Sequence, residues 1–347
     1  MYVKRSLCCL FGVLFLTSVT GCVQFERISP AIETGDNPHV ATQNKDIRHY
    51  EKNLSPIVLE RVPYRDSKYY DAYRLSTPSS GTNEQPGNVV SGEYLASRGL
   101  ARKKLVIIVP IYGSSSIPPE NLAMHLTVWN GDADTNVLLL HGTDDLFNWN
   151  EMAHSATLQE FLDEVDASAR RITTTITDVR RLIDWAETRP EIDPKRIGIA
   201  GLSISAMIGS MVMGTDPRVA AGVFAMGGGN WQDIFVHCTS EDVATAREHV
   251  MRSFGLAPEE LRIMLEQRLR AVNPMHVIGH VNTARVLIVD SLYDDFIPRS
   301  TQDALWRALG KPERITLKYA HKEAFLRSII GLHFTERVSA TFFKEKL

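Results

Sequence analysis

The chain has 347 residues, of which 44% are apolar and 23% are charged, and its formal net charge is −3. This composition supplies enough apolar material for a sizeable core, and the length fits one large α/β domain with an insertion as well as two domains. The near-neutral balance gives no indication of the concentrated basic surface that phosphate binding needs, so no nucleic-acid partner is predicted.

Residues 1–22 have the pattern of an export signal, because two basic residues precede the apolar stretch 7–16 and small residues then lead to Cys22. The apolar stretch is too short to span a bilayer. The ending Val-Thr-Gly-Cys resembles the lipobox of bacterial lipoproteins, which implies fatty acylation of Cys22; the alternative is a plain signal peptide with a chance cysteine. Val23 follows in place of the aspartate associated with inner-membrane retention, so we expect a lipid anchor in the outer membrane, facing the periplasm.

Only one of the four cysteines remains after removal of the signal and acylation of Cys22, namely Cys238. No internal disulfide is therefore expected, despite export. The neighbours of Cys238 show no turn signature, so a structural thiol is favoured over a nucleophile.

Residues 23–50 are polar and irregular, and they predict a flexible tether before a domain that spans residues 51–347. Short runs then indicate strands at 57–62, 69–75 and 89–96. In the last run, apolar and small residues alternate with mostly polar neighbours, which is typical of half-buried antiparallel strands.

From residue 105 onward the apolar runs become continuous, as in strands that are covered on both faces. Helical patterns separate most of these runs, and the clearest, at 172–186, repeats apolar residues at intervals of three and four. Helices are also predicted at 305–309 and 324–343. The alternation predicts an α/β fold with a mostly parallel sheet and helices on both faces. The predicted strands are 105–110, 137–141, 197–200, 219–226, 286–290 and 315–319.

Residues of about 230–280 interrupt this alternation with two helical segments, 241–254 and 259–271, that have no strand between them. Ordinary connections are only a few residues long. We therefore expect a helical cap insertion over the carboxyl edge of the sheet, where ligands bind in open α/β sheets.

Ser203 follows the predicted strand 197–200 in the run Gly201-Leu-Ser-Ile-Ser205, ahead of a helical pattern. A serine on such a strand-to-helix turn exposes its hydroxyl and is a candidate nucleophile, with the N–H of Ile204 as an oxyanion donor. The usual pattern is G-x-S-x-G, and Ser205 stands at its last glycine. That position must be small, so serine is an acceptable substitute.

A candidate acid and a candidate base follow downstream. Asp294 lies just past the strand 286–290, and an acid there would hold a histidine in the required tautomer; Asp290, Asp295 and Asp233 are alternatives. His321 lies at a strand end and precedes a helix, and histidine suits proton transfer near neutral pH. His333, within the last predicted helix, indicates a packing or surface role.

The chain order Ser203, Asp294, His321 is the order of the α/β-hydrolase triad. Together with the segments 201–205, 289–298 and 319–321, it resembles α/β-hydrolase-fold serine hydrolases of the dienelactone-hydrolase-like and prolyl-oligopeptidase-like branch, from about residue 55 to the end.

The resemblance also implies roles for individual residues. In the family the second segment usually reads His-Gly-x-x-Asp-x-x-Val-Pro, so alignment on Pro298 implies Asp294 as the acid, while Asp290-Ser291 replace His-Gly. The family's second oxyanion donor comes from the loop after the first long parallel strand, which implies the backbone of Tyr112 or Gly113. The pair His141-Gly142 belongs to the next strand and predicts a structural role.

The implied activity is hydrolysis of carboxylic esters through an acyl-enzyme, with a small-molecule ester or a peptide as substrate and no cofactor. A peptidase with the same triad, or a non-catalytic binding lipoprotein on this fold, are the alternatives. Two groups of potential metal ligands lack a convincing local structure for a site, so no metal is predicted. The first group is His141, Asp144, Asp145 and His154, and the second is His276 with His280.

Overall fold

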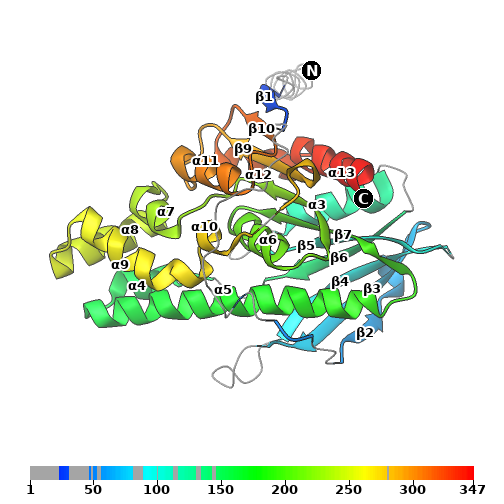
Figure 1. Cartoon of the computed structure of the whole chain (residues 1–347), viewed down its shortest axis with the longest axis horizontal. Coiled ribbons are helices and arrows are strands. Elements are labelled where there is room, and N and C mark those ends of the chain that lie inside the picture. The colour runs from blue at the N-terminus through cyan, green and yellow to red at the C-terminus, as the bar shows by residue number, and fades with distance from the viewer. Residues whose placement is uncertain are drawn as a thin grey trace, which may run out of the picture.

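The computed structural model describes residues 23–30, 47, 50–52, 56–80, 89–99, 101–111, 116–129, 134–142, 146–279 and 281–347. These residues form one ten-stranded mixed sheet with helices on both faces (Figure 1). The predicted fold class is therefore confirmed.

The strands lie in the order β1-β10-β9-β8-β7-β5-β6-β4-β3-β2 across the sheet. The six strands β5 to β10 are parallel to one another. β1, β2, β3 and β4 pair antiparallel with their neighbours. The described strands are β1 (Phe25–Ile28), β2 (Val58–Arg61), β3 (Tyr70–Pro78), β4 (Val89–Ser97), β5 (Lys103–Ile108), β6 (Thr135–His141), β7 (Ile192–Leu202), β8 (Val219–Ala225), β9 (Val286–Ser291) and β10 (Glu313–Leu317).

Each face of the sheet has its own hydrophobic core. One core joins the sheet to α5 and α6, and the other joins it to α3 and α13. The described helices are α3 (Ile117–Met124), α4 (Trp149–His154), α5 (Leu158–Glu187), α6 (Ile204–Thr215), α7 (Trp231–His237), α8 (Glu241–Phe254), α9 (Pro258–Leu269), α10 (Pro274–Val277), α11 (Arg299–Ala308), α12 (His321–Ile329) and α13 (Phe334–Lys346), with a π-helical turn η2 (His125–Trp129) and 3₁₀ turns η1 (Pro63–Arg65), η3 (Arg270–Val272) and η4 (Thr283–Arg285). No helix among the described residues is both long and apolar enough to cross a membrane.

Helix α5 shows why the periodic segment 172–186 was informative. Its side chains at Ile172, Ile176 and Ile183 are buried against the sheet, because residues three and four apart share one face of a helix. Thr157 caps its N-terminus by accepting a hydrogen bond from the Glu160 N–H at 3.2 Å.

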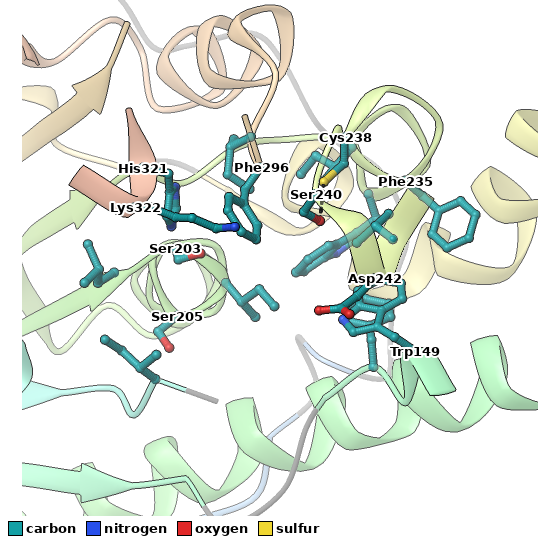
Figure 2. A pocket seen from close by; sticks show the side chains of 18 of the residues that line it. Trp149, Ser203, Ser205, Phe235, Cys238, Ser240, Asp242, Phe296, His321 and Lys322 are labelled. Carbon is teal, nitrogen blue, oxygen red and sulfur yellow. Dashed lines mark hydrogen bonds between the residues drawn. The ribbon is translucent and has the colours of Figure 1, made fainter. Parts of the chain in front are cut away.

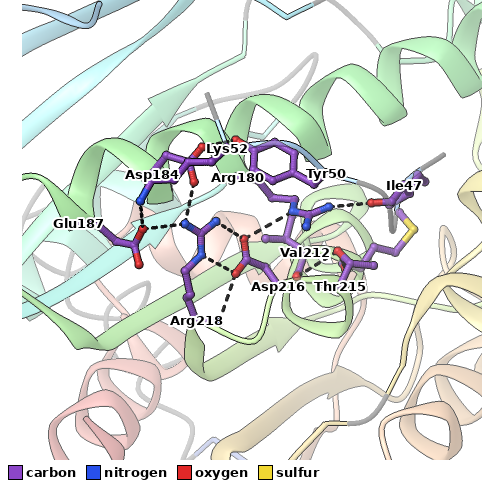
Figure 3. A network of polar contacts seen from close by, with 11 residues as sticks. Ile47, Tyr50, Lys52, Arg180, Asp184, Glu187, Val212, Thr215, Asp216 and Arg218 are labelled. Atoms are coloured by element: carbon purple, nitrogen blue, oxygen red, sulfur yellow. Dashed lines mark hydrogen bonds and ion pairs between the residues drawn. The ribbon is translucent and has the colours of Figure 1, made fainter. Parts of the chain in front are cut away.

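A buried network of charges ties α5 to the turn between α6 and β8 (Figure 3). Arg218 donates to Asp184 and to Asp216, each at 2.6 Å, and also contacts Glu187 at 3.0 Å. Burial opposes the charged form of Asp216, but the hydrogen bonds and charge of Arg218 outweigh it and lower the pKa of this carboxyl. Arg218 thus bridges the two buried carboxylates, and Arg180 contacts Asp216 at 3.4 Å while the Tyr50 hydroxyl donates to Asp184 at 2.5 Å.

Helices α7 to α10 lie between β8 and β9, and α8 and α9 coincide with the two predicted helical segments of the insertion. In α9, Leu261, Leu265 and Leu269 are buried in the same core as the apolar face of α5. The insertion is thus packed on the domain.

Two sequence-based expectations differ from the structure. The predicted helix 324–343 is two helices, α12 and α13, with Gly331 between them at a φ of 88°, which glycine adopts without steric cost. His333 consequently precedes α13 instead of lying within a helix, and its ring stacks on Trp129 with 4.9 Å between centroids.

The predicted tether at 23–50 is wrong for its first residues. β1 pairs antiparallel with β10, Val23 packs against the core, and Ile47 is also buried. The strand was missed because its residues are mixed in polarity and are stabilised by a partner nearly 300 positions away. The signal segment 1–22, with Cys22, lies outside the described residues.

Candidate active site

Ser203 occupies the tight turn between β7 and α6. Its φ of 60° and ψ of −126° lie outside the regions that non-glycine residues usually adopt, which is the strain expected at a nucleophile turn. The Ser203 N–H donates to the Ala225 carbonyl of the adjacent strand β8 at 2.8 Å, and this bond holds the turn in place. Gly201 is required because a Cβ there would lie 2.1 Å from the Ser205 carbonyl oxygen.

Ser205 has a specific contact that explains how a serine fits at this position. Its side chain is fully buried, and its Oγ donates to the carbonyl of Pro110, just after β5. The residue that departs from the usual motif therefore connects α6 to the start of the loop in which the second oxyanion donor was predicted.

His321 and Asp294 meet at the carboxyl ends of β10 and β9. His321 Nδ1 lies 2.8 Å from Asp294 Oδ2, and the two side chains are 6% and 1% exposed. The other carboxylate oxygen, Oδ1, accepts the backbone N–H groups of Phe296 and Ile297 at 2.9 and 2.8 Å. A carboxylate that faces Nδ1 places the proton on that nitrogen, so Nε2 is left as the acceptor.

The other acids considered have different partners. Asp290 is buried and pairs with Arg314 and Arg299; burial raises its pKa to about 6, although both arginines favour its charged form. Asp233 pairs with Arg262 at 3.8 Å. Asp295 differs, because its Oδ1 is buried without a hydrogen-bond partner among the described residues and only its backbone carbonyl accepts, from the N–H and hydroxyl of Thr239 in the insertion.

Ser203 and His321 line one cavity of about 540 Å³ between the sheet edge and the insertion. In Figure 2, Ser203, His321 and Lys322 lie on one side of this space, and Trp149 and Asp242 lie on the other. The rings of Phe296 and Phe325 flank the His321 imidazole, with centroids 5.0 and 5.8 Å away. The candidate catalytic side chains are therefore set in a largely apolar surface.

The aromatic lining of this cavity was not identified from the sequence. Residues from α4, α7 and the segment before α4 form an aromatic group, in which Phe147 stacks on Trp149 with 5.0 Å between ring centroids and lies tilted against Trp231 at 5.3 Å. Their positions in the sequence carry no motif, and only the folded insertion brings them to the cavity. Their location just before and within the predicted insertion was the one available indication.

The predicted oxyanion donors and the remaining cysteine are described only in part. Ile204 begins α6, so its N–H is one of those that helix geometry leaves without an intrahelical acceptor. Tyr112 and Gly113 lie outside the described residues, but the preceding Ile111 lines the cavity. Cys238 is buried, and its Sγ lies 3.1 Å from the Ser240 Oγ. Both residues lie across the cavity from His321 (Figure 2).

The potential metal ligands considered from the sequence show no shared site among the described residues. His141 ends β6, and His154 Nδ1 contacts the Asn150 carbonyl at 2.8 Å within α4. His276 belongs to the short helix α10. Asp144, Asp145 and His280 lie outside the described residues.

Comparison with known proteins identifies the fold but not a close relative. No known protein-family profile matches the chain, and no curated protein sequence matches it. Among solved structures, acetyl xylan esterase 1 from Thermoanaerobacterium sp. JW/SL YS485 aligns with a TM-score of 0.59 at 16% identity, covering 88% of this chain and 96% of that one. An acetyl xylan esterase from Paenibacillus sp. R4 gives 0.61 at 15% identity, covering 89% and 97%. The acylaminoacyl peptidase of Pyrococcus horikoshii gives 0.52 at 14% identity, covering 82% of this chain but 43% of that one. The chain therefore has the α/β-hydrolase fold.

Proposed function

We propose that this protein is a serine hydrolase that cleaves carboxylic esters, with Ser203 as nucleophile, His321 as base and Asp294 as the acid that orients His321. The observation that carries the proposal is the 2.8 Å contact between His321 Nδ1 and Asp294, at the same cavity into which the strained Ser203 turn opens. Fold alone would not support it, because one fold hosts many functions.

The reaction follows from this arrangement. As the Ser203 Oγ attacks the ester carbonyl, its proton passes to His321 Nε2, and the Asp294 carboxylate stabilises the resulting imidazolium. The Ile204 N–H, at the positive end of α6, would stabilise the oxyanion, and the loop at Tyr112 would supply a second donor. His321 then protonates the leaving alcohol, and a water molecule activated by the same histidine hydrolyses the acyl-enzyme.

An ester is favoured over a peptide because the cavity offers few groups that could bind a peptide backbone. Its described lining is dominated by aliphatic and aromatic side chains, and its charged members are Asp242 and Lys322. Recognition of a peptide requires polar groups placed at the edge of its main chain. The same triad would still cleave an amide if binding were provided, so both substrate types belong in the assay.

We further propose that the mature protein is a lipoprotein of the outer membrane, facing the periplasm and acylated at Cys22. The lipobox-like ending of the signal and the residue Val23 after it support this assignment.

A fluorophosphonate probe tests the enzymatic proposal. We expect labelling of the wild-type protein and loss of labelling in Ser203→Ala. Ser240→Ala is the matched control, because Ser240 also lines the cavity but lies beside Cys238. A folded wild-type protein that takes up no probe would sink the assignment, and nitrophenyl esters run beside aminoacyl amides would separate esterase from peptidase.

A further inference from the structure

We propose that a lipid bilayer covers the edge of the molecule at which the active-site cavity opens, and that the substrates are esters with long hydrocarbon chains that enter the cavity from this bilayer. This inference rests on the proposed hydrolase function and on acylation of Cys22, and it adds an orientation and a substrate class to them.

The pairing of β1 determines where the anchor would lie. Because β1 is antiparallel to β10, its N-terminal end lies at the C-terminal end of β10, with Phe25 opposite Leu317. The Gln24 carbonyl accepts the N–H of Lys318 at 3.0 Å, and the chain then continues to His321. A parallel pairing would have placed the anchor at the opposite edge of the sheet.

The chain between the predicted acylation site, Cys22, and strand β1 is short. Val23 packs against the core, and Cys22 is bonded directly to it. Val23 is two residues before Phe25, and Leu317, which lies opposite Phe25, is four residues before His321. An acyl chain on Cys22 would therefore hold this edge of the sheet against the membrane.

Exposed apolar side chains gather at the same edge. We call Phe25, Tyr293, Leu326, Ile329 and Ile330 the apolar rim; their exposed fractions are 45%, 63%, 55%, 48% and 49%. Leu326 and Ile329 lie on α12 and Ile330 follows directly after it; Leu326 precedes the other two by three and four residues, which places all three close to one face of the helix. An exposed apolar surface of this kind indicates contact with a partner or a membrane.

Three contacts connect the rim to both the anchor and the cavity. Leu326 and Ile329 line the cavity while remaining half exposed. Phe25 lies against Phe334 at the start of α13, with 5.1 Å between ring centroids. The Tyr293 N–H donates to the Tyr319 carbonyl at 3.3 Å, two residues before His321. In Figure 1, β1 lies beside β10 with α12 and α13 close by.

The cavity behind the rim suits a hydrocarbon chain. Its volume of about 540 Å³ is far larger than an acetyl group needs, and its aromatic and aliphatic walls extend from Ser203 to Trp149. Each methylene transferred from water to such a surface strengthens binding about fourfold. A bilayer against the rim would deliver such chains without passage through water.

The orientation is tested by fluorescence of the full-length acylated protein in phosphatidylcholine vesicles. An environment-sensitive fluorophore is attached at Ile330→Cys or, as the matched control, at Ile263→Cys, which is 43% exposed on α9 in the insertion. We expect a blue shift and quenching by brominated lipid at position 330 but not at 263. Equal spectra at the two positions, or mature protein without an acyl group on Cys22, would overturn the orientation.

The substrate class is tested by kinetics, first on esters in solution and then on esters in the same vesicles. For nitrophenyl esters in solution, we expect kcat/KM to rise at least tenfold from the acetyl to the octanoyl ester; a flat or falling series would contradict the role of the cavity. Ile330→Ser should lower the rate of hydrolysis of a long-chain ester embedded in vesicles about tenfold, but it should leave the rate of hydrolysis of nitrophenyl butyrate in solution unchanged. Ile263→Ser should change neither rate. Equal effects of the two variants would refute delivery from the membrane. If wild-type protein hydrolyses no ester, the proposed function fails, while the fluorescence experiment still decides the orientation.

Discussion

Replacing Asp294 with asparagine probes the proposed triad at a point where the structure dictates the outcome. One carboxylate oxygen of Asp294 accepts two backbone N–H groups, from Phe296 and Ile297, and the other accepts from His321 Nδ1. In Asp294→Asn the amide oxygen must stay with the two N–H donors, because an NH₂ group there would face them. The NH₂ group is then directed at His321 Nδ1, which must lose its proton to accept this hydrogen bond, so the proton moves to Nε2.

A histidine protonated at Nε2 cannot take the proton of Ser203, and the imidazolium loses its carboxylate partner. We therefore expect kcat/KM for nitrophenyl butyrate to fall by about 10⁴ at neutral pH, as for loss of the correct tautomer in other serine triads, which corresponds to about 5.4 kcal/mol of transition-state stabilisation. Circular dichroism should show a folded protein, because the variant is isosteric. Asp295→Asn is the matched control and should retain activity within tenfold. A loss of less than tenfold in Asp294→Asn, or a larger loss in Asp295→Asn, would refute the assignment.

Three further predictions concern stability and can be measured by urea unfolding. Ser205→Ala removes the donor to the buried Pro110 carbonyl, and we expect the free energy of unfolding to fall by about 1–3 kcal/mol; no change would mean that this bond is unimportant. Arg218→Met leaves the buried carboxylates of Asp184 and Asp216 without their shared partner, which should cost about 3–5 kcal/mol, and a neutral effect would contradict the role given to the network. Because the pKa of Asp216 is lowered below its usual 3.8, its contribution to stability is present above pH 3.8 and is lost as the pH falls further. The wild-type protein should therefore lose stability in this acid range more steeply than Arg218→Met, and parallel pH profiles would contradict this.

The parts of the fold that could be predicted from the sequence are those determined by local patterns. The buried strands β5, β6, β8 and β9, and the second half of β7, contain continuous runs of apolar and small residues, and α5 has a clear helical period, so each was recognisable without its neighbours; β10 is more mixed in polarity. The Ser203 turn belongs to the same group, because its strand, its glycine and its helix are adjacent in the chain. The chain order of the three candidate triad residues then restricted their arrangement.

The parts that could not be predicted depend on contacts between distant segments. β1 is a short, exposed strand with two adjacent charged residues, Glu26 and Arg27, and it forms because β10 offers a free edge; nothing in residues 23–30 indicates that partner. The aromatic wall of the cavity is likewise assembled by folding of the insertion. The division of the last helix at Gly331 was visible as a residue type, but a glycine inside an apolar periodic segment does not by itself predict a break.

The positions at which this chain departs from the usual hydrolase motifs have their own partners in the structure. Ser205 replaces a glycine and binds the Pro110 carbonyl. Ser291 replaces another, and its Oγ donates to the Tyr319 carbonyl, which joins the ends of β9 and β10 immediately before the loops that carry Asp294 and His321.

Asp290, in the position of the usual histidine, pairs with the buried Arg314 of β10 and so links the same two strands a second time. Two of these replacements therefore stabilise the relative position of the candidate acid and base, and the third stabilises the loop after β5. All three side chains are buried, and both serine hydroxyls donate to backbone carbonyls, whereas Oδ1 of Asp290 has no hydrogen-bond partner among the described residues. Contacts that hold the proposed acid and base in position support the proposal of an active enzyme over that of a binding scaffold.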